Sequence, residues 1–175
     1  MMYCMPGSKK IAVIVVLESN QHWLMLKRKY PPNQDLYTPV GGKLEAGESP
    51  KEAALREVHE EAGIELQNIA YCGVLVDSAP TNYNWICFVY RANVDCFKPP
   101  FCSEGLLSWI PISALHTIPK PVTDPYLYPL VLAHTPFYLS AVYSEDDQLV
   151  SLTEEIAGVC LFSDNSLKHE HEHEI

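Results

Sequence analysis

The chain has 175 residues, of which 47% are hydrophobic and 19% charged, so it has one domain's length and enough apolar side chains for a core. This composition excludes a disordered or fibrous protein. Lys and Arg number 12 against 22 Asp and Glu, and the net charge of -10 argues against binding to duplex nucleic acid or an anionic membrane. Any phosphate-bearing ligand would need a local cation.

The cysteine pattern indicates a reducing compartment. The six cysteines contain no C-x-x-C pair, and several lie in apolar stretches where they fit as small hydrophobic residues. No stretch approaches the roughly 18 consecutive apolar residues of a membrane span, and Met1–Lys10 is too short and too polar for a signal peptide. We therefore expect a cytoplasmic protein, either a monomer or a homodimer.

Short apolar stretches rich in β-branched residues predict strands along the whole chain. Polar turns separate the first two and the last two of these stretches, which predicts a hairpin at each end. The predicted strands are Ile11–Leu17, His22–Lys29, Leu36–Val40, Ile69–Val76, Trp85–Tyr90, Leu106–Ile110, Phe137–Tyr143 and Gln148–Leu152.

Two helices are predicted between these strands. Ser49 is an N-cap residue with Glu52 completing a capping box, and Gly63 supplies the stop for the first helix. Asp124 is a candidate N-cap for the second helix, which should run from about Pro125 to His134.

The elements interleave without a repeat or a long linker. One mixed α/β domain over residues 1–160 is therefore predicted. Residues 161–175 are predicted to be a disordered or tag-like tail, because His169–Glu174 alternates imidazoles with carboxylates.

The first predicted helix concentrates acidic side chains. Glu57, Glu60 and Glu61 are three and four residues apart, so they should project from one helical face, where like charges repel. A hard divalent cation such as Mg²⁺ would offset this repulsion, since it takes oxygen ligands. Arg56 can pair with Glu60 or reach back to Glu48 in the preceding loop.

The alternative to a metal site is a solvated acidic face. Such a face normally interleaves Lys and Arg, whereas the interior of this helix offers only Arg56. The preceding Gly41-Gly42 pair also lets the loop backbone approach a metal or a phosphate, as residues with a Cβ could not.

These residues resemble a known family. Gly42, Glu48 and the run Arg56–Ile64 match every fixed position of the Nudix box, G-x5-E-x7-R-E-U-x-E-E-x-G-U, in which U is aliphatic. The resemblance implies an α/β fold, the α/β/α sandwich of Nudix hydrolases with a mixed β-sheet. It also implies Mg²⁺ or Mn²⁺ as cofactor and hydrolysis of a nucleoside diphosphate linked to another moiety, hence a small-molecule nucleotide as partner.

The resemblance also implies roles for individual residues. One carboxylate of the cluster, Glu57 or Glu60, would orient the attacking water. Glu48 and Arg56 would be a structural pair. The implied metal ligands are the carboxylates of Glu57, Glu60 and Glu61 and the carbonyl of Gly42.

Further segments resemble MutT-like enzymes that hydrolyse oxidised purine nucleoside triphosphates such as 8-oxo-dGTP. They are Tyr37–Glu45, Glu104–Trp109 and Asp124–Pro129. By this resemblance Glu104 would be an additional metal ligand or base, and Asp124 would hydrogen-bond the purine edge. The alternatives are a solvated loop carboxylate for Glu104 and a simple N-cap for Asp124.

Other residues are candidates for binding the nucleotide. Thr38 stands where this branch often has an Asn in the base pocket, and Pro121 stands where a Trp stacks on the base. Arg28, within the basic cluster Lys27–Lys29, and Lys43 are candidates for holding phosphates. An edge strand guarded against aggregation would explain the basic cluster equally well.

Two other functions remain open. Pro80 resembles a marker of ADP-ribose pyrophosphatases, although a turn between strands explains it equally well. Tyr37, Tyr83 and Trp85 are aromatic residues that could stack on a base or belong to the core. The domain could also be a noncatalytic nucleotide sensor, but such domains typically lose box glutamates that this chain retains.

Overall fold

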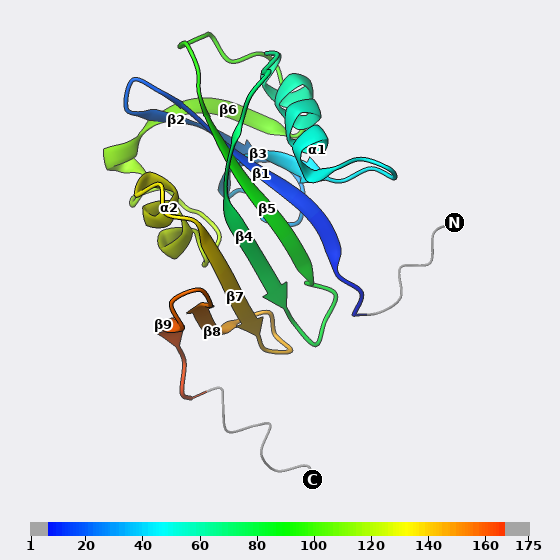
Figure 1. Cartoon of the computed structure of the whole chain (residues 1–175), viewed down its shortest axis with the longest axis vertical. Helices are drawn as coiled ribbons and strands as arrows, with labels where there is room; N and C mark the ends of the chain where they lie inside the picture. The colour runs from blue at the N-terminus through cyan, green and yellow to red at the C-terminus, as the bar shows by residue number, and fades with distance from the viewer. Residues whose placement is uncertain (1–6, 167–175) are drawn as a thin grey trace.

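Nine strands form one mixed sheet in the computed structural model, which describes residues 7–166 (Figure 1). The strand order is β6-β2-β3-β1-β5-β4-β7-β8-β9. Pairs β1–β5 and β4–β7 are parallel and the other pairs are antiparallel. The strands are β1 Lys10–Ser19, β2 His22–Arg28, β3 Tyr37–Lys43, β4 Ala70–Ser78, β5 Trp85–Asn93, β6 Gly105–Pro111, β7 Phe137–Tyr143, β8 Leu149–Glu154 and β9 Val159–Ser163.

The eight predicted strands are present, and the ninth was not predicted. Strand β9 crosses the predicted domain boundary at residue 160, so the boundary lies too early and the sheet continues into the predicted tail. The reason is a turn at Gly158, whose φ is 67°, after which the short apolar run Val159–Phe162 pairs with β8 alone. The His169–Glu174 run lies outside the described residues.

Helix α1, Pro50–Glu57, begins as the capping box predicts. The Ser49 hydroxyl accepts from the Glu52 N–H, and the Glu52 carboxylate accepts from the Ser49 N–H. The helix does not continue as a regular α-helix to Gly63 but widens into a π-helical turn over Val58–Ala62. Gly63 then ends it with a left-handed φ of 70°.

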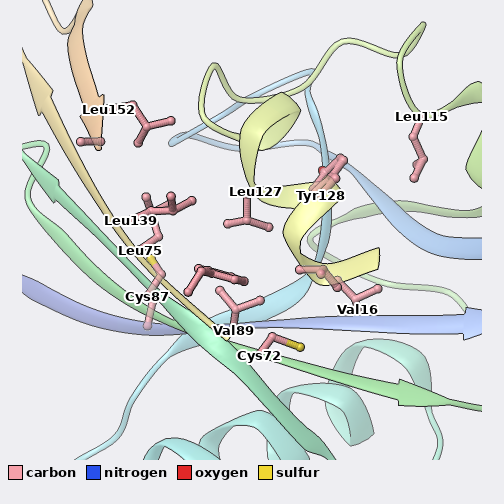
Figure 2. Packing of buried hydrophobic residues seen from close by; sticks show 14 of the residues in the cluster. Val16, Cys72, Leu75, Cys87, Val89, Leu115, Leu127, Tyr128, Leu139 and Leu152 are labelled. Atoms are coloured by element: carbon pink, nitrogen blue, oxygen red, sulfur yellow. The ribbon is translucent and has the colours of Figure 1, made fainter. Parts of the chain in front are cut away.

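The sheet separates two hydrophobic clusters, one under each helix. Alternation along β1 sends Val13 and Val15 toward α1, whose Ala53 and Ala54 are fully buried, and sends Ala12 and Val16 to the opposite face. Helix α2, Asp124–Leu132, covers that opposite face. Leu127 and Tyr128 of α2 lie over β5, the strand that carries Cys87 and Val89 (Figure 2). A short 3₁₀ helix, η2, covers Ile112–Ala114.

The fold agrees with the expected α/β architecture, in which one mixed sheet lies between helices. The described cysteines, at positions 72, 87, 96, 102 and 160, are all free thiols. Within residues 7–166, neither helix is long and apolar enough to cross a membrane.

The left-handed residue at the end of the box helix gives a first prediction. Gly63→Ala should lower the free energy of unfolding by roughly 1 kcal/mol, because a Cβ disfavours positive φ. The nearest atoms to such a Cβ, in Pro100, are at ordinary contact distances of 3.5 and 3.8 Å, so the cost is one of backbone conformation. Urea denaturation checks it, and Gly63→Asn should lose less, since Asn tolerates this conformation. Equal losses for Ala and Asn would contradict it.

Candidate functional site

A single cavity of about 740 Å³ brings together ten of the eleven predicted site residues. Its volume falls in the range of small-molecule sites. Glu48 is the predicted residue that does not line it. The predicted residues in the lining are Arg28, Thr38, Gly42, Lys43, Arg56, Glu57, Glu60, Glu61, Glu104 and Asp124.

Arg56 holds the box loop and the box helix together. Its Nε and Nη2 donate to the two carboxylate oxygens of Glu48 at 2.8 and 3.0 Å, and Nη2 also donates to the Lys43 carbonyl at 3.0 Å. Its Nη1 donates to Glu57 Oε1 at 2.8 Å and Glu60 Oε2 at 3.2 Å. Because the bonds to Glu48 are bidentate and charge-assisted, they raise the pKa of Arg56 and lower that of Glu48.

Glu57 and Glu61 are the two box carboxylates whose pKa burial raises. Glu61 is 5% exposed, and its Oε2 accepts from the Gly41 N–H at 3.1 Å. Burial raises the pKa of Glu61 to about 7, and it also raises that of Glu57 against the opposing effect of Arg56. A Cβ on Gly42 would lie 2.2 Å from Glu57 Oε1, so glycine is what lets this carboxylate pack against the loop backbone.

Glu60 has a different environment from its two neighbours. Its side chain is 55% exposed and is held beside Arg56. The expectation that all three glutamates share one face assumed 3.6 residues per turn, and the π-helical turn changes that spacing. Glu61 is therefore turned inward against Gly41 while Glu60 lies at the cavity rim.

The donor set at this end of the cavity suits Mg²⁺ or Mn²⁺, because it consists of carboxylate and backbone carbonyl oxygens. Within residues 7–166, no group of three or more His, Cys, Asp or Glu side chains is already arranged around a metal position. Arg56 explains why the carboxylates are not grouped in this way, because its Nη1 donates hydrogen bonds to Glu57 and Glu60. Glu57, Glu61 and the Gly42 backbone, which form a desolvated acidic cluster at the cavity wall, are the groups that would hold a cation.

Two cations and a further acid lie near this cluster. Arg28 Nη2 is 3.8 Å from Glu104 Oε2, whose side chain is half exposed. Lys43 Nζ lies over the ring of Trp85, 5.9 Å from its centroid. Of the basic run Lys27–Lys29, Arg28 is the residue that lines the cavity.

Asp124 lines the same cavity and is 5% exposed. It is not the N-cap of α2, which is Thr123 and makes no side-chain capping bond. The Asp124 carboxylate instead accepts from the Tyr128 hydroxyl at 2.6 Å, one helical turn further on. Burial raises the pKa of Asp124 to about 7. The simple N-cap interpretation is therefore wrong.

Sequence reasoning missed Asp77, a second buried acid in the cavity wall. It lies on β4, is 3% exposed, and accepts from the Tyr143 hydroxyl at 3.1 Å. Burial raises the pKa of Asp77 to about 6. Its signal in the sequence is an Asp two residues after the inward-facing Leu75, which puts the carboxylate on the inward face of a mostly apolar strand.

The remaining candidates divide between the cavity and its surroundings. Thr38 and Pro121 line it, and the Thr38 hydroxyl is the one buried side-chain polar atom in residues 7–166 without a hydrogen-bond partner. Trp85 is in the wall, but Lys10 and Lys43 lie over its ring. Pro80 is exposed in the β4–β5 loop and is not part of the lining.

Comparison with known proteins identifies the family. The NUDIX domain model matches residues 8–131, more than two thirds of the chain. The chain belongs to the Nudix family. The structure also resembles a MutT protein from Bacillus halodurans, with a TM-score of 0.72 at 24% identity over 82% of this chain and 95% of that one. The Nudix domain of Shewanella oneidensis NrtR, solved with ADP ribose, gives a TM-score of 0.61 at 18% identity over 72% and 88%.

Curated relatives match over shorter stretches. The NAD-capped RNA hydrolase NudC of Haemophilus influenzae is 41% identical over 63 residues, which are 34% of this chain and 24% of that protein. A putative 8-oxo-dGTP diphosphatase of Bacillus subtilis is 43% identical over 63 residues, 36% of this chain and 40% of that protein. This Nudix chain thus covers about a quarter of the first relative and less than half of the second.

The buried Asp124 predicts a stability that depends on pH. The folded chain retains the Asp124 proton to about pH 7, whereas an unfolded chain releases it near 3.9. Folding therefore becomes less favourable as pH rises between these values. Asp124→Asn should gain stability relative to the parent protein across this range and keep a constant advantage above it.

Urea unfolding of both proteins at pH 4 to 9 measures this difference. The exposed Asp146 offers a control, and Asp146→Asn should show a difference from the parent that does not vary with pH. A difference for Asp124→Asn that is equally flat would contradict burial of an acid at this position.

Proposed function

We propose that the protein is a divalent-metal-dependent Nudix hydrolase that cleaves a phosphoanhydride bond of an oxidised purine nucleoside triphosphate such as 8-oxo-dGTP. The products are the nucleoside monophosphate and pyrophosphate. The observation that carries this proposal is the cavity itself. It joins the box carboxylates Glu57, Glu60 and Glu61 at one end to the buried acid Asp124 at the other.

The box end supplies the hydrolytic chemistry in this proposal. Glu57, Glu60, Glu61 and the Gly42 carbonyl would hold the cation, and Glu104 would add a further carboxylate. Mg²⁺ or Mn²⁺, when bound, neutralises phosphate oxygens and supplies an activated water. Glu57 or Glu60 orients the water, which attacks phosphorus as the anhydride P–O bond breaks and pyrophosphate leaves.

The phosphate chain would lie between the carboxylates and the base end. Arg28 and Lys43 supply the local cations that a protein of net charge -10 needs for a polyanionic substrate. Glu48 acts indirectly, because it fixes the Arg56 guanidinium from which Glu57 and Glu60 accept their hydrogen bonds.

The base end, the part of the wall around Asp124, combines polar groups with apolar side chains such as Cys87. Asp124 offers a carboxyl group to the N–H donors of a purine edge, and the unpartnered Thr38 hydroxyl offers a further hydrogen bond. Pro121 is in the wall where a stacking Trp would stand in this branch, so base stacking there is weaker.

A second candidate is hydrolysis of the pyrophosphate in ADP-ribose or another nucleotide sugar. The name of the NudC relative and the ADP-ribose complex of the NrtR domain favour it. Pro80, the sequence feature that suggested it, lies outside the cavity wall and adds no support.

A substrate panel separates these functions. Phosphate and pyrophosphate release is measured with Mg²⁺, and with EDTA as control, on 8-oxo-dGTP, 2-hydroxy-dATP, the normal nucleoside triphosphates, ADP-ribose, NAD and diadenosine polyphosphates. We expect the highest kcat/KM on an oxidised purine triphosphate, with pyrophosphate as product. Preference for ADP-ribose or NAD would replace the proposed substrate, and no turnover would favour a noncatalytic sensor.

The box carboxylates can be tested directly. Glu57→Gln and Glu60→Gln should each lower kcat by roughly a hundredfold or more, because each loses a charged oxygen ligand or base. Both variants should keep the thermal midpoint within a few degrees. Glu65→Gln, at an exposed position just beyond the helix, is the matched control and should retain activity. Near-normal rates in both box variants would rule out this metal site.

A further inference from the structure

Asp77 is a buried acid with no place in the hydrolytic chemistry. It comes from β4, whereas Asp124 comes from the start of α2, so the two acids reach one cavity from separate elements. The two lie close enough for the charge of Asp77 to contribute to the raised pKa of Asp124. Tyr83 and Cys87, which also line the cavity, have pKa values raised in part by the charges of both acids.

Hydrogen bonding leaves most of the capacity of the Asp77 carboxylate unused. Tyr143 is its one side-chain donor within the part of the chain that the structure describes. The adjacent amine, Lys9 Nζ, is directed elsewhere, to the Asp77 backbone carbonyl and Ser78 Oγ, both at 2.7 Å. An ionised carboxylate has about four acceptor sites, and a buried acceptor left unpaired is destabilising. Such a group in a cavity wall is suited to a ligand that donates N–H bonds.

We propose that Asp77 is a specificity residue that, together with Asp124, reads the base of the nucleotide and favours a guanine-type edge over an adenine-type edge. This proposal rests on the proposed function and names its substrate class more closely. A guanine edge presents an imino N–H beside an exocyclic amino group, which gives adjacent donors to two carboxyl groups. An adenine edge places a ring acceptor beside its amino group, so one acid would face a lone pair.

The alternative is that Asp77 serves only to join β4 to β7 through Tyr143. Two substitutions distinguish these roles. Asp77→Asn keeps the size and one acceptor oxygen, so it can still accept from Tyr143 but offers the base an amide donor in place of the second oxygen. Tyr143→Phe removes the same inter-strand bond and leaves the carboxylate facing the cavity.

The experiment measures kcat/KM for 8-oxo-dGTP, dGTP and dATP on the parent chain and both variants, with thermal midpoints to establish folding. Asp77→Asn should lower the guanine-to-adenine ratio of kcat/KM by roughly tenfold to a hundredfold, the effect of an unpaired polar group in a recognition site. Tyr143→Phe should leave the ratio within about twofold. An unchanged ratio in Asp77→Asn, or an equal fall in Tyr143→Phe, would overturn the proposal.

A binding measurement keeps the test independent of hydrolysis and of variant folding. Calorimetry on the parent chain compares dGMP with dIMP, which lacks the exocyclic 2-amino donor, and with dAMP. We expect dIMP and dAMP to bind roughly tenfold or more weakly than dGMP, and equal affinities would overturn the role of the acids. If the parent chain hydrolyses no triphosphate yet shows this order of affinities, the proposed function fails while the recognition by Asp77 and Asp124 survives.

Discussion

The arrangement of the site depends on one guanidinium. Arg56 binds both oxygens of Glu48, the Lys43 carbonyl, Glu57 and Glu60, so it links the end of β3, the box loop and the box helix. An isolated surface ion pair contributes little, but here one planar, always charged group fixes several acceptors at once. The loop geometry and the positions of two carboxylates are therefore coupled, which is why the Nudix box needs Arg at this position and why Lys would not replace it.

Backbone contacts and burial also position two of the box carboxylates. Glu61 accepts from Gly41, and Glu57 rests against Gly42 where a Cβ has no room. Burial raises the pKa of both groups, so folding brings acidic oxygens together at a free-energy cost that a cation, if bound, would offset. The π-helical turn over Val58–Ala62 belongs to the same arrangement, since it turns Glu61 inward; turns of this kind often occur at functional sites.

Local signals were sufficient to predict much of this structure. The capping box at Ser49 and the glycine at position 63 mark the ends of the box helix, because caps and left-handed residues act over a few neighbours. Fixed spacing in the Nudix box identified the residues that line one end of the cavity. Strand β9 was missed because its run is short, lies at the sheet edge and is only partly buried, so no alternation marks it.

Other features depend on contacts between distant parts of the chain and carry no local signal. The spacing of the glutamates assumed a regular α-helix, and the π-helical turn became visible only in three dimensions. Asp124 was expected to be either a cap or a base-reading acid. Its hydrogen bond to Tyr128 excludes the capping role but leaves recognition of the base a proposal. The surroundings of Asp77 are known only from the fold. They are its hydrogen bond to Tyr143, 66 residues away, and the cavity to which α2 and β4 each contribute an acid.

The two ends of the cavity use buried carboxyl groups in opposite ways. At the box end, Glu57 accepts a hydrogen bond from Arg56 and Glu61 accepts one from Gly41. These two carboxylates are suited to a cation. At the base end, Asp77 and Asp124 each accept from one tyrosine hydroxyl, and the amine nearest Asp77 is bound to other oxygens. A neutral donor such as a base N–H satisfies an acid in that setting without adding charge. The same residue type can thus serve chemistry at one end and recognition at the other because its neighbours differ.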